Sequence, residues 1–402
     1  MMIRVALGQS KMVKRPVAGI LHIFVYAGFV IINLEVLEIL IDGVFGTHRV
    51  FAPLGSLYNL LIGSFEVLAL LVLAGCVVFL IRRNILKLKR FWMREMTAWP
   101  RTDATIILIT EILLMAAFLT LNATDSILQS RNVDHYIVAG AFPVSSLFRD
   151  WFASISTSSV LMIERGSWWF HIIGILAFLN YIPYSKHFHI VLSFPNVYYS
   201  NLDQKAKFTN MESVTREVKL MLDPSAVPPA TEAPPTGFGA KDVYDLTWKN
   251  LMDAYSCTEC GRCTSVCPAN QTGKLLSPRK IMMDTRDRLE EVGKFLDKNK
   301  QSIKKNTKEE QAAGSLKEGD GKSLFSYISE EELWACTTCN ACVEACPVNI
   351  DPLNIILEMR RYLVMEQSKV PAELATMFSK IENNGAPWQF SQADRFNWGK
   401  GD

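Results

Sequence analysis

The sequence predicts an all-α protein, with a bundle of membrane-spanning helices followed by a helical, cysteine-rich domain. Nearly all the long apolar runs of the 402-residue chain lie in its first 200 residues. A segment rich in proline and small residues, 221–241, follows them. Eight of the nine cysteines come after residue 256, in two compact groups. We therefore expect a membrane domain (1–200), a linker (201–245), a cysteine-rich domain (246–385) and a C-terminal docking tail (386–402).

The membrane domain is predicted from apolar runs of the length that a transmembrane helix needs, about 20 residues. Four runs meet this length: 17–41, 57–81, 104–122 and 168–190. The stretch 136–163 is interrupted by Pro143, Arg149 and Asp150, so we expect interfacial helices there. Lysine and arginine crowd the N-terminus and the loop 82–101, so the positive-inside rule places both, and everything after the fourth run, in the cytoplasm. The first run is too long for a signal-peptide core, and we expect it to be retained.

The cysteine-rich domain is predicted to be helical and to follow an extended linker. Proline and small residues in 221–241 favour a semi-rigid, extended chain. The charged segment 299–323 contains few apolar residues and is predicted to form a mobile surface loop. Helix-like stretches are expected near 242–255, 278–298, 329–335, 352–367 and 371–383.

Both cysteine groups, "CTECGRCTSVCP" and "CTTCNACVEACP", have the spacing C-x2-C-x2-C-x3-C-P. In this ferredoxin pattern three close thiolates bind one [4Fe-4S] cluster and the fourth cysteine ligates the other cluster. A structural zinc site is the alternative, but it needs only four ligands in two pairs and leaves the other cysteines and the prolines unexplained. The first cluster is thus assigned Cys257, Cys260, Cys263 and Cys346, and the second Cys336, Cys339, Cys342 and Cys267.

In this assignment the fourth cysteine of each run ligates the cluster of the other run, and this crossed ligation also predicts how the domain folds. Two cysteine runs about 70 residues apart share ligands only if the helices between them fold back. We therefore expect a helical two-[4Fe-4S] ferredoxin domain with adjacent clusters.

Four histidines lie in the apolar runs: His22, His171, His187 and His189. His171 and His189 are eighteen residues apart, which is five whole turns of one helix, so both should share a face about 27 Å apart along its axis. His22 begins the first run on the side where His189 ends the fourth. Paired axial imidazoles on a heme b are a natural use for intramembrane histidines. The alternative is that these histidines are ordinary polar side chains near the membrane surfaces, with their hydrogen bonds satisfied.

The run "FHIIGILAFLNYIPYSKHFHI" resembles the last helix of the cytochrome b (gamma) subunit of respiratory nitrate reductases, whose pattern is H-x11-P-aromatic-S-basic-x2-H. The stretch "HIFVYAGF", which starts at His22, is similar to that family's first heme-bearing helix. The resemblance implies that His22 and His189 hold a heme nearer the cytoplasm. It implies that His171 serves a heme nearer the outer face.

The sequence departs from that family at one position. The family has a second histidine ten residues after the first, and Ile32 occupies this place here. A second heme would therefore need His48 or His135 as the partner of His171, and an ordinary loop role for His48 is equally open.

Residues 17–400 together resemble membrane iron-sulfur oxidoreductases of the heterodisulfide-reductase type, including those that link electron-transfer flavoprotein to menaquinone. The resemblance rests on the heme-binding runs, the proline linker, the two cysteine groups and an "NGAPW...R..W"-like segment. Fused members continue beyond that segment into cysteine-rich CCG domains, whereas this chain stops at Asp402. The resemblance implies a separate CCG-type subunit, electron-transfer flavoprotein or another dehydrogenase as partners, and a location in the bacterial inner membrane.

No nucleotide fingerprint, P-loop, flavin motif or nucleophile elbow is recognisable. By elimination, the mobile two-electron partner is menaquinone or another quinone from the bilayer, and no nucleic acid partner is expected. The candidate proton carriers are the intramembrane acids Glu35, Glu38, Glu66 and Glu111, for which polar packing is the alternative. We predict an electron-transfer subunit of a quinone-linked membrane oxidoreductase. A non-enzymatic membrane redox sensor or scaffold with cysteine-bound metal is the alternative.

Overall fold

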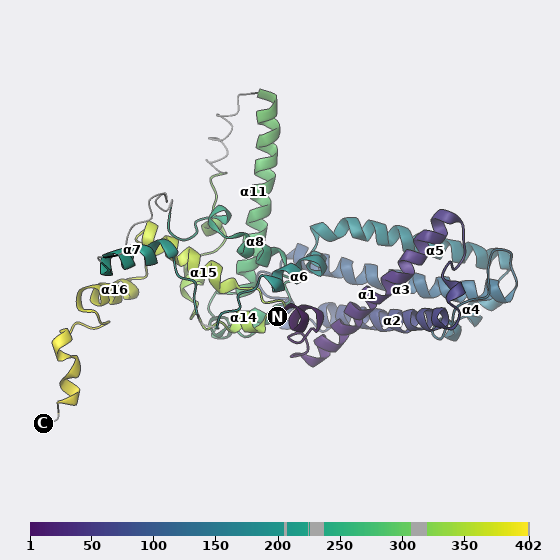
Figure 1. Ribbon diagram of the computed structural model, residues 1–402, viewed down its shortest axis with the longest axis horizontal. Coiled ribbons are helices and arrows are strands. Elements are labelled where there is room, and N and C mark those ends of the chain that lie inside the picture. The colour runs from purple at the N-terminus through teal and green to yellow at the C-terminus, as the bar shows by residue number, and fades with distance from the viewer. Residues whose placement is uncertain (205–206, 224, 226–236, 307–319, 401–402) are drawn as a thin grey trace. The chain divides into compact units, whose positions relative to one another are not determined.

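The computed structural model describes residues 1–204, 207–223, 225, 237–306 and 320–400, and these form helices and no strand (Figure 1). The predicted all-α class is therefore confirmed. The chain divides into two compact units. The bundle unit comprises Met1–Leu202, Met252–Cys267 and Ala341–Ile350, and the α11 unit comprises Asp203–Leu251, Pro268–Asn340 and Asp351–Asp402.

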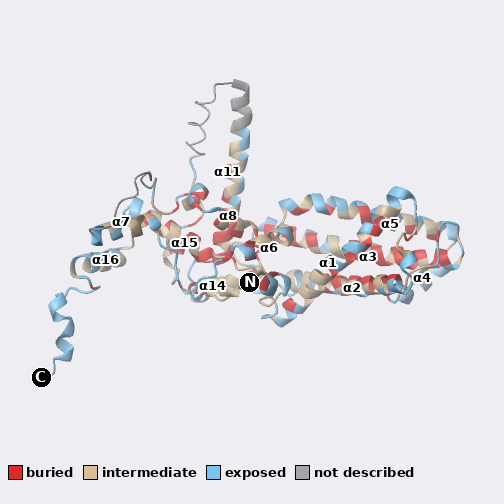
Figure 2. Ribbon diagram, in the orientation of Figure 1, coloured by how far each residue is buried: buried red, intermediate tan, exposed pale blue. Residues whose placement is uncertain are grey.

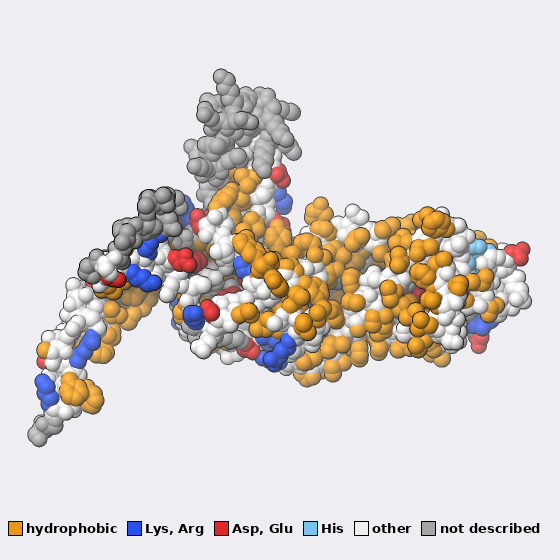
Figure 3. All heavy atoms as spheres, viewed as in Figure 1, with side chains coloured by type: hydrophobic (Ala, Val, Ile, Leu, Met, Phe, Trp, Pro, Cys, Tyr) orange, Lys and Arg blue, Asp and Glu red, His pale blue; other side chains and the backbone are white. Residues whose placement is uncertain are grey.

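Four long helices dominate the bundle unit: α1 (Pro16–Phe45), α2 (Ser56–Leu80), α3 (Ala98–Ser130) and α5 (Thr157–Tyr181). Within the described residues, these are the four helices long and apolar enough to cross a membrane. Large apolar side chains such as Val30, Leu34 and Leu60 are more than half exposed. Hydrophobic side chains cover the visible surface of these helices in Figure 3. Lipid is the solvent that suits such a surface.

The four helices pack in the order α1, α2, α3, α5, and α1 makes few contacts with α5. Glycines allow the close approaches: an added Cβ at Gly28 would collide with Val72 of α2. An added Cβ at Gly174 of α5 would lie 2.6 Å from Leu114 Cδ2 of α3. Small residues serve this purpose in membrane helix pairs. The alternating chain direction gives the bundle an N-terminal end, where α1 begins, and an opposite end, where α1 stops and α2 begins.

The fourth span ends earlier than predicted, and one inference drawn from its predicted end is wrong. Helix α5 ends at Tyr181, and two 3-10 turns, η6 (Ile182–Tyr184) and η7 (Lys186–Phe188), precede α6 (His189–Tyr198). Pro183 lacks the N–H that an α-helix needs at this point. His171 and His189 therefore do not lie on one helix, and the five-turn register between them does not exist.

The expected interfacial helices between 136 and 163 are reduced to two short turns. These are η5 (Ser145–Leu147) and α4 (Asp150–Ala153). Helix α5 already begins at Thr157, because the Ser156 hydroxyl caps it by accepting from the Ser159 N–H at 3.2 Å. The last residues of the predicted interfacial stretch therefore belong to the fourth span.

The helices predicted after the linker are present. They are η8 (Val243–Asp245) with α8 (Trp248–Tyr255), α11 (Pro278–Asn306), α13 (Glu330–Trp334), α15 (Pro352–Arg361) with η10 (Tyr362–Glu366), and α16 (Ala372–Asn384). A further helix, α7 (Glu212–Leu222), lies in the predicted linker. Helix α11 continues to Asn306, so the predicted loop 299–323 begins as helix. The remainder of that loop to 319, and 226–236 of the linker, lie outside the described residues.

The core of the α11 unit joins α11 and α15 to the segment before α13 (Figure 2). Leu276, Ile281, Leu324, Leu333 and Met359 are fully buried. Arg288 of α11 lies beside this core, and its side chain is 1% exposed. It pairs with Asp242 and with Asp320, each at 2.6 Å, so one buried cation fastens two loops to the helix.

Candidate functional site

The structure brings the four cysteines assigned to the first cluster together within the bundle unit. The short helices α9 (Arg262–Ser265) and α14 (Ala341–Ala345) pack against each other there, which carries Cys346 to the first cysteine run. Burial, with Cys260 and Cys257 as charged neighbours, raises the pKa of the Cys346 thiol to about 12. Burial and the same neighbours raise the pKa of Cys263 well above its ordinary value. A metal that binds these thiols must therefore displace their protons.

The backbone around the first two cysteines of each run has the same unusual shape. The second and fourth residues after the first cysteine have positive φ in both runs: Glu259 (56°) and Gly261 (70°), and Thr338 (56°) and Asn340 (58°). Three of these four residues are not glycine, so the conformation is strained and specific. Successive left-handed turns aim backbone N–H groups into a concavity, which suits an iron-sulfur cluster. The local backbone of both runs therefore fits the predicted cofactor.

The residues assigned to the second cluster are divided between the two units. Cys267 and Cys342 belong to the bundle unit, and Cys336 and Cys339 belong to the α11 unit. Their common ligation of one cluster stays a prediction. In the described part of the chain, no three His, Cys, Asp or Glu side chains are grouped so as to hold a single metal ion.

His22 of α1 and His189 of α6 face each other at the N-terminal end of the bundle. Their ring centres are 6.4 Å apart. An imidazole nitrogen bonds a metal at about 2.0 Å and lies about 1.2 Å from its ring centre, so two rings on opposite sides of one iron have centres about 6.4 Å apart. The His22 Nδ1 atom is buried without a hydrogen-bond partner. His22 and His189 would therefore be the residues to hold a heme iron, which would supply a one-electron carrier.

A backbone carbonyl orients the second histidine of this pair. His189 Nδ1 lies 3.0 Å from the carbonyl oxygen of Lys186, so it donates there when it carries the proton. This leaves Nε2 as the nitrogen for a metal, the usual arrangement of a metal-binding histidine. The adjacent His187 is buried between Phe29 and Phe178, with ring centres 6.4 and 5.2 Å away.

His171 lies away from this pair, against α3. It is 1% exposed, and its Nδ1 lies 3.0 Å from the carbonyl oxygen of Leu114. Its ring packs on Phe118, with centres 5.8 Å apart. A role for His171 on an outer heme stays a prediction.

The second histidine proposed for the outer heme has both ring nitrogens engaged. His48 Nε2 lies 2.9 Å from Asp125 Oδ1, and its Nδ1 accepts from the Ile137 N–H at 3.2 Å. His135 lies beside it, with ring centres 5.6 Å apart. His48 would have to give up one of these bonds to bind iron.

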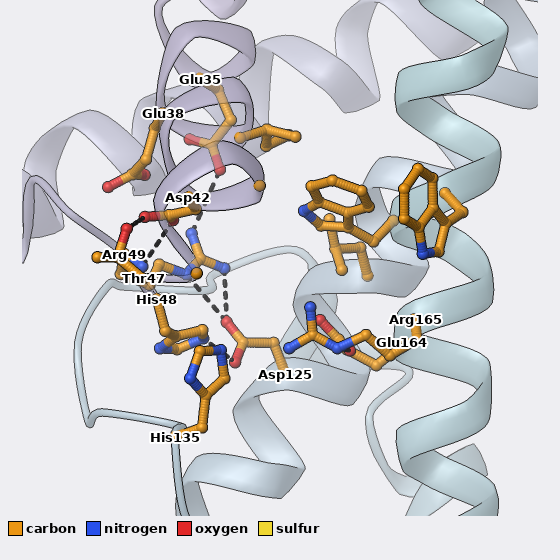
Figure 4. Close-up of a pocket in the computed structure, with 16 residues that line it drawn as sticks. Glu35, Glu38, Asp42, Thr47, His48, Arg49, Asp125, His135, Glu164 and Arg165 are labelled. Carbon is orange, nitrogen blue, oxygen red and sulfur yellow. Dashed lines mark hydrogen bonds and ion pairs between the residues drawn. The ribbon is translucent and has the colours of Figure 1, made fainter.

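A cavity of about 190 Å³ lies at the opposite end of the bundle, between α1, α3, α5 and the segment after α1 (Figure 4). The cavity is lined by Glu35, Glu38, Ile39, Asp42, Gly43, Gly46, Thr47, His48, Arg49, Leu121, Asp125, His135, Glu164, Arg165, Trp168 and Trp169.

Arg49 is the central charge of this cavity and is 6% exposed. Its guanidinium donates to Asp125 Oδ2 at 2.6 and 3.0 Å and to Asn122 Oδ1 at 2.8 Å. It also lies 3.3 Å from Glu35 Oε1 and 3.4 Å from the Tyr58 hydroxyl. Five contacts satisfy the buried cation and fix its position.

The four predicted proton carriers have different surroundings. Glu35 lines the cavity, and its Oε2 atom is buried without a hydrogen-bond partner. Glu38 accepts from the Phe51 N–H at 2.9 Å and from the Tyr58 hydroxyl at 2.8 Å.

The other two acids lie outside the cavity lining. Glu66 is fully buried and accepts from the N–H groups of Val144 and Ser145 at 2.8 and 3.1 Å, so it anchors the segment after α3. Glu111 lies partly exposed on α3.

Sequence reasoning missed Arg49 and Asp125, although one signal was present. Arg49 is the single lysine or arginine in 42–56, a segment predicted to face the outside, where basic residues are depleted. A lone arginine there indicates a buried structural or functional charge. Its partner Asp125 lies three residues beyond the predicted third span, and no local pattern connects the two.

Comparison with known proteins agrees with the cysteine pattern. Residues 256–350 match the family model described as a 4Fe-4S dicluster domain. Over 97% of its length the chain is 28% identical to a probable iron-sulfur-binding oxidoreductase, FadF, of Bacillus subtilis and 29% identical to an EtfAB:quinone oxidoreductase of Syntrophomonas wolfei. These alignments cover 53% and 52% of the two relatives. The chain thus spans about half the length of these curated relatives.

A shorter relative matches one part of the chain. It is a subunit of a ferredoxin/F420H2-dependent CoB-CoM heterodisulfide reductase from Methanosarcina acetivorans, and it is 31% identical over 33% of the chain and 60% of its own length. No solved structure is significantly similar to the chain. The relatives are iron-sulfur oxidoreductases, and the chain joins a 4Fe-4S dicluster domain to four helices of membrane-spanning length and composition.

Proposed function

We propose that this chain is the electron-transfer subunit of a quinone-linked membrane oxidoreductase. It would relay electrons between a soluble partner, two [4Fe-4S] clusters, a heme b and menaquinone or another quinone. The observation that carries the proposal is the 6.4 Å separation of His22 and His189, in the same unit as the first cysteine set. The name of the Syntrophomonas relative supports the quinone.

His22 and His189 would be the axial ligands of the heme, and the Lys186 carbonyl would hold the His189 ring in place. A bound heme would supply a one-electron carrier inside the bundle. The left-handed turns at Glu259, Gly261 and their counterparts in the second run would direct backbone N–H groups toward the clusters.

The cavity around Arg49 would receive the quinone ring. Reduction of a quinone to a quinol takes two electrons and two protons, so the site needs a proton carrier beside a group that holds the ring oxygen. Arg49 would have to give up one of its five contacts to donate to that oxygen, and the unpartnered Glu35 Oε2 can carry a proton. Trp168 also lines the cavity and offers a flat surface for the ring. These contacts favour Glu35 over the other three candidate acids.

A separate iron-sulfur subunit of the CCG type would supply the substrate site. The Methanosarcina relative, which matches one third of the chain, is itself named as a subunit. The C-terminal segment after α16 exposes Phe390, Phe396 and Trp398 by 60% or more. Exposed aromatic side chains of this kind suit a protein interface. Electron-transfer flavoprotein or another dehydrogenase would be the further partner.

The charge pattern supports a bacterial inner membrane location with the N-terminal end of the bundle in the cytoplasm. The loop between α2 and α3 is rich in arginine and lysine, as the positive-inside rule requires for a cytoplasmic loop. The cavity would then lie at the outer side.

The deciding experiment measures heme by pyridine hemochrome, together with iron and zinc, in the detergent-purified chain. We expect one heme and about eight non-heme irons per chain, the number for two [4Fe-4S] clusters. Two hemes would support His171 as a ligand and require a partner for it, either His48 or His135. Absence of heme together with bound zinc would overturn the proposal and favour a membrane sensor or scaffold.

A further inference from the structure

The first cysteine run is fastened to the bundle through two side chains that alternate with its ligands. In "CTECGRC" these are Glu259, between Cys257 and Cys260, and Arg262, between Cys260 and Cys263. They are 2% and 5% exposed. Glu259 contacts the segment of the bundle unit that carries His189, and Arg262 contacts the segment that precedes α1, the helix of His22.

Glu259 contacts the segment that carries His189. The Lys186 ammonium donates to the Glu259 carboxylate and to the Pro100 carbonyl, the latter at 2.6 Å. It also lies 3.9 Å from Asp103 Oδ2, and all three charged side chains are 8% exposed or less. The backbone carbonyl of the same Lys186 lies 3.0 Å from His189 Nδ1. Glu259 is thus joined to His189 through a single residue.

Arg262 contacts the segment packed beside His22. Its guanidinium donates to the carbonyls of Lys11 and Met12, each at 3.1 Å. An added Cβ at Gly19 would lie 2.8 Å from that Met12 oxygen, so the segment rests directly on α1. Gly19 and His22 are three residues apart and therefore neighbours on one face of α1. Arg15 adds a contact to Ser265 Oγ at 2.5 Å.

We propose that Glu259 and Arg262 are positioning residues that dock the first cysteine run onto the segment carrying His189 and onto the segment packed against the helix of His22. The cluster held by Cys257, Cys260, Cys263 and Cys346 is then the one that exchanges electrons directly with the heme. In this step one electron passes from the reduced cluster to the ferric heme iron, or back, and no bond or proton changes place. The inference rests on the proposed function.

Buried charges explain why this docking is specific. A buried ion pair is favourable only when both partners and their remaining hydrogen bonds are satisfied, so a displaced run would lose the buried pair between Lys186 and Glu259. Two contacts on different segments also fix the orientation of the run, which a single contact would not do. The second cluster would consequently be the one nearer the soluble partner.

The test uses the purified full chain with its heme and clusters bound, in detergent. A laser flash on soluble deazaflavin supplies electrons, and the rate of heme reduction is followed optically. We expect Glu259→Gln and Arg262→Gln each to slow this rate by at least about tenfold. The first change removes the buried ionic partner of Lys186, and the second removes the donor to the Lys11 and Met12 carbonyls, and either loss shifts a docking equilibrium by that factor or more. Glu290→Gln changes an exposed carboxylate of α11 and should keep the wild-type rate.

The heme midpoint potential, the low-spin heme EPR signal and the iron content should stay at wild-type values in both variants. Wild-type reduction rates with full heme and iron would overturn the inference. If either variant loses iron, Lys186→Met is the variant that tests the docking contact. Lys186 lies outside the cysteine run, and the change keeps the backbone carbonyl that contacts His189. Slow reduction with full iron in Lys186→Met supports docking, and a wild-type rate overturns it. Absence of heme from the wild-type chain would instead overturn the proposed function.

Discussion

Replacing Arg49 by glutamine should strongly destabilise the bundle unit. The change removes a 6%-exposed guanidinium that bonds Asp125, Asn122, Glu35 and Tyr58. The buried carboxylates of Glu35 and Asp125 then lose the cation with which they pair. Removing one partner of a buried ion pair costs about 3–5 kcal/mol. His48 still bonds Asp125, so we expect the lower part of that range.

The assay is unfolding of the purified chain in mixed micelles by sodium dodecyl sulfate, followed by circular dichroism. Arg94→Gln is the matched control, because Arg94 is exposed and the change should cost less than about 0.5 kcal/mol. Arg49→Lys should give an intermediate loss, since lysine keeps the charge but lacks the planar fork that bonds Asp125. A loss below about 1 kcal/mol in Arg49→Gln would refute the argument that this cation holds the cavity together.

Three further predictions concern the other sites. Cys346→Ser should impair the cluster whose other ligands begin at Cys257, and an EPR change confined to the second cluster would show that ligation is not crossed. His189→Ala should abolish the heme between it and His22, whereas His187→Ala should retain it; normal hemochrome content in His189→Ala would disprove the assignment. Hydrogen bonding to Arg288 lowers the pKa of Asp320 to about 2, so its stabilising effect should be constant above about pH 4 and disappear as the pH falls from about 4 toward 2. The stability difference between the wild type and Asp320→Asn, measured by urea unfolding, should follow this curve, and a constant difference down to pH 2 would contradict it.

The sequence alone determined the features that depend on local pattern. Four apolar runs predict four long helices, because a membrane span is a matter of length and continuous hydrophobicity. The cysteine spacing identified the dicluster domain over the region that the family model also matches, because cluster ligation requires fixed short intervals. The helices after the linker were predicted near their observed positions for the same local reason.

Only the tertiary structure decided which distant residues meet. The turn at Pro183 ends α5 early, so His189 turns toward His22 instead of continuing the register of His171. No pattern in the sequence connects Arg49 with Asp125, seventy-six residues away. Such pairings depend on how loops reverse the chain and on how closely helices approach at positions such as Gly28 and Gly174. Periodicity specifies the face of a helix within one element, whereas packing between elements selects the partner that this face meets.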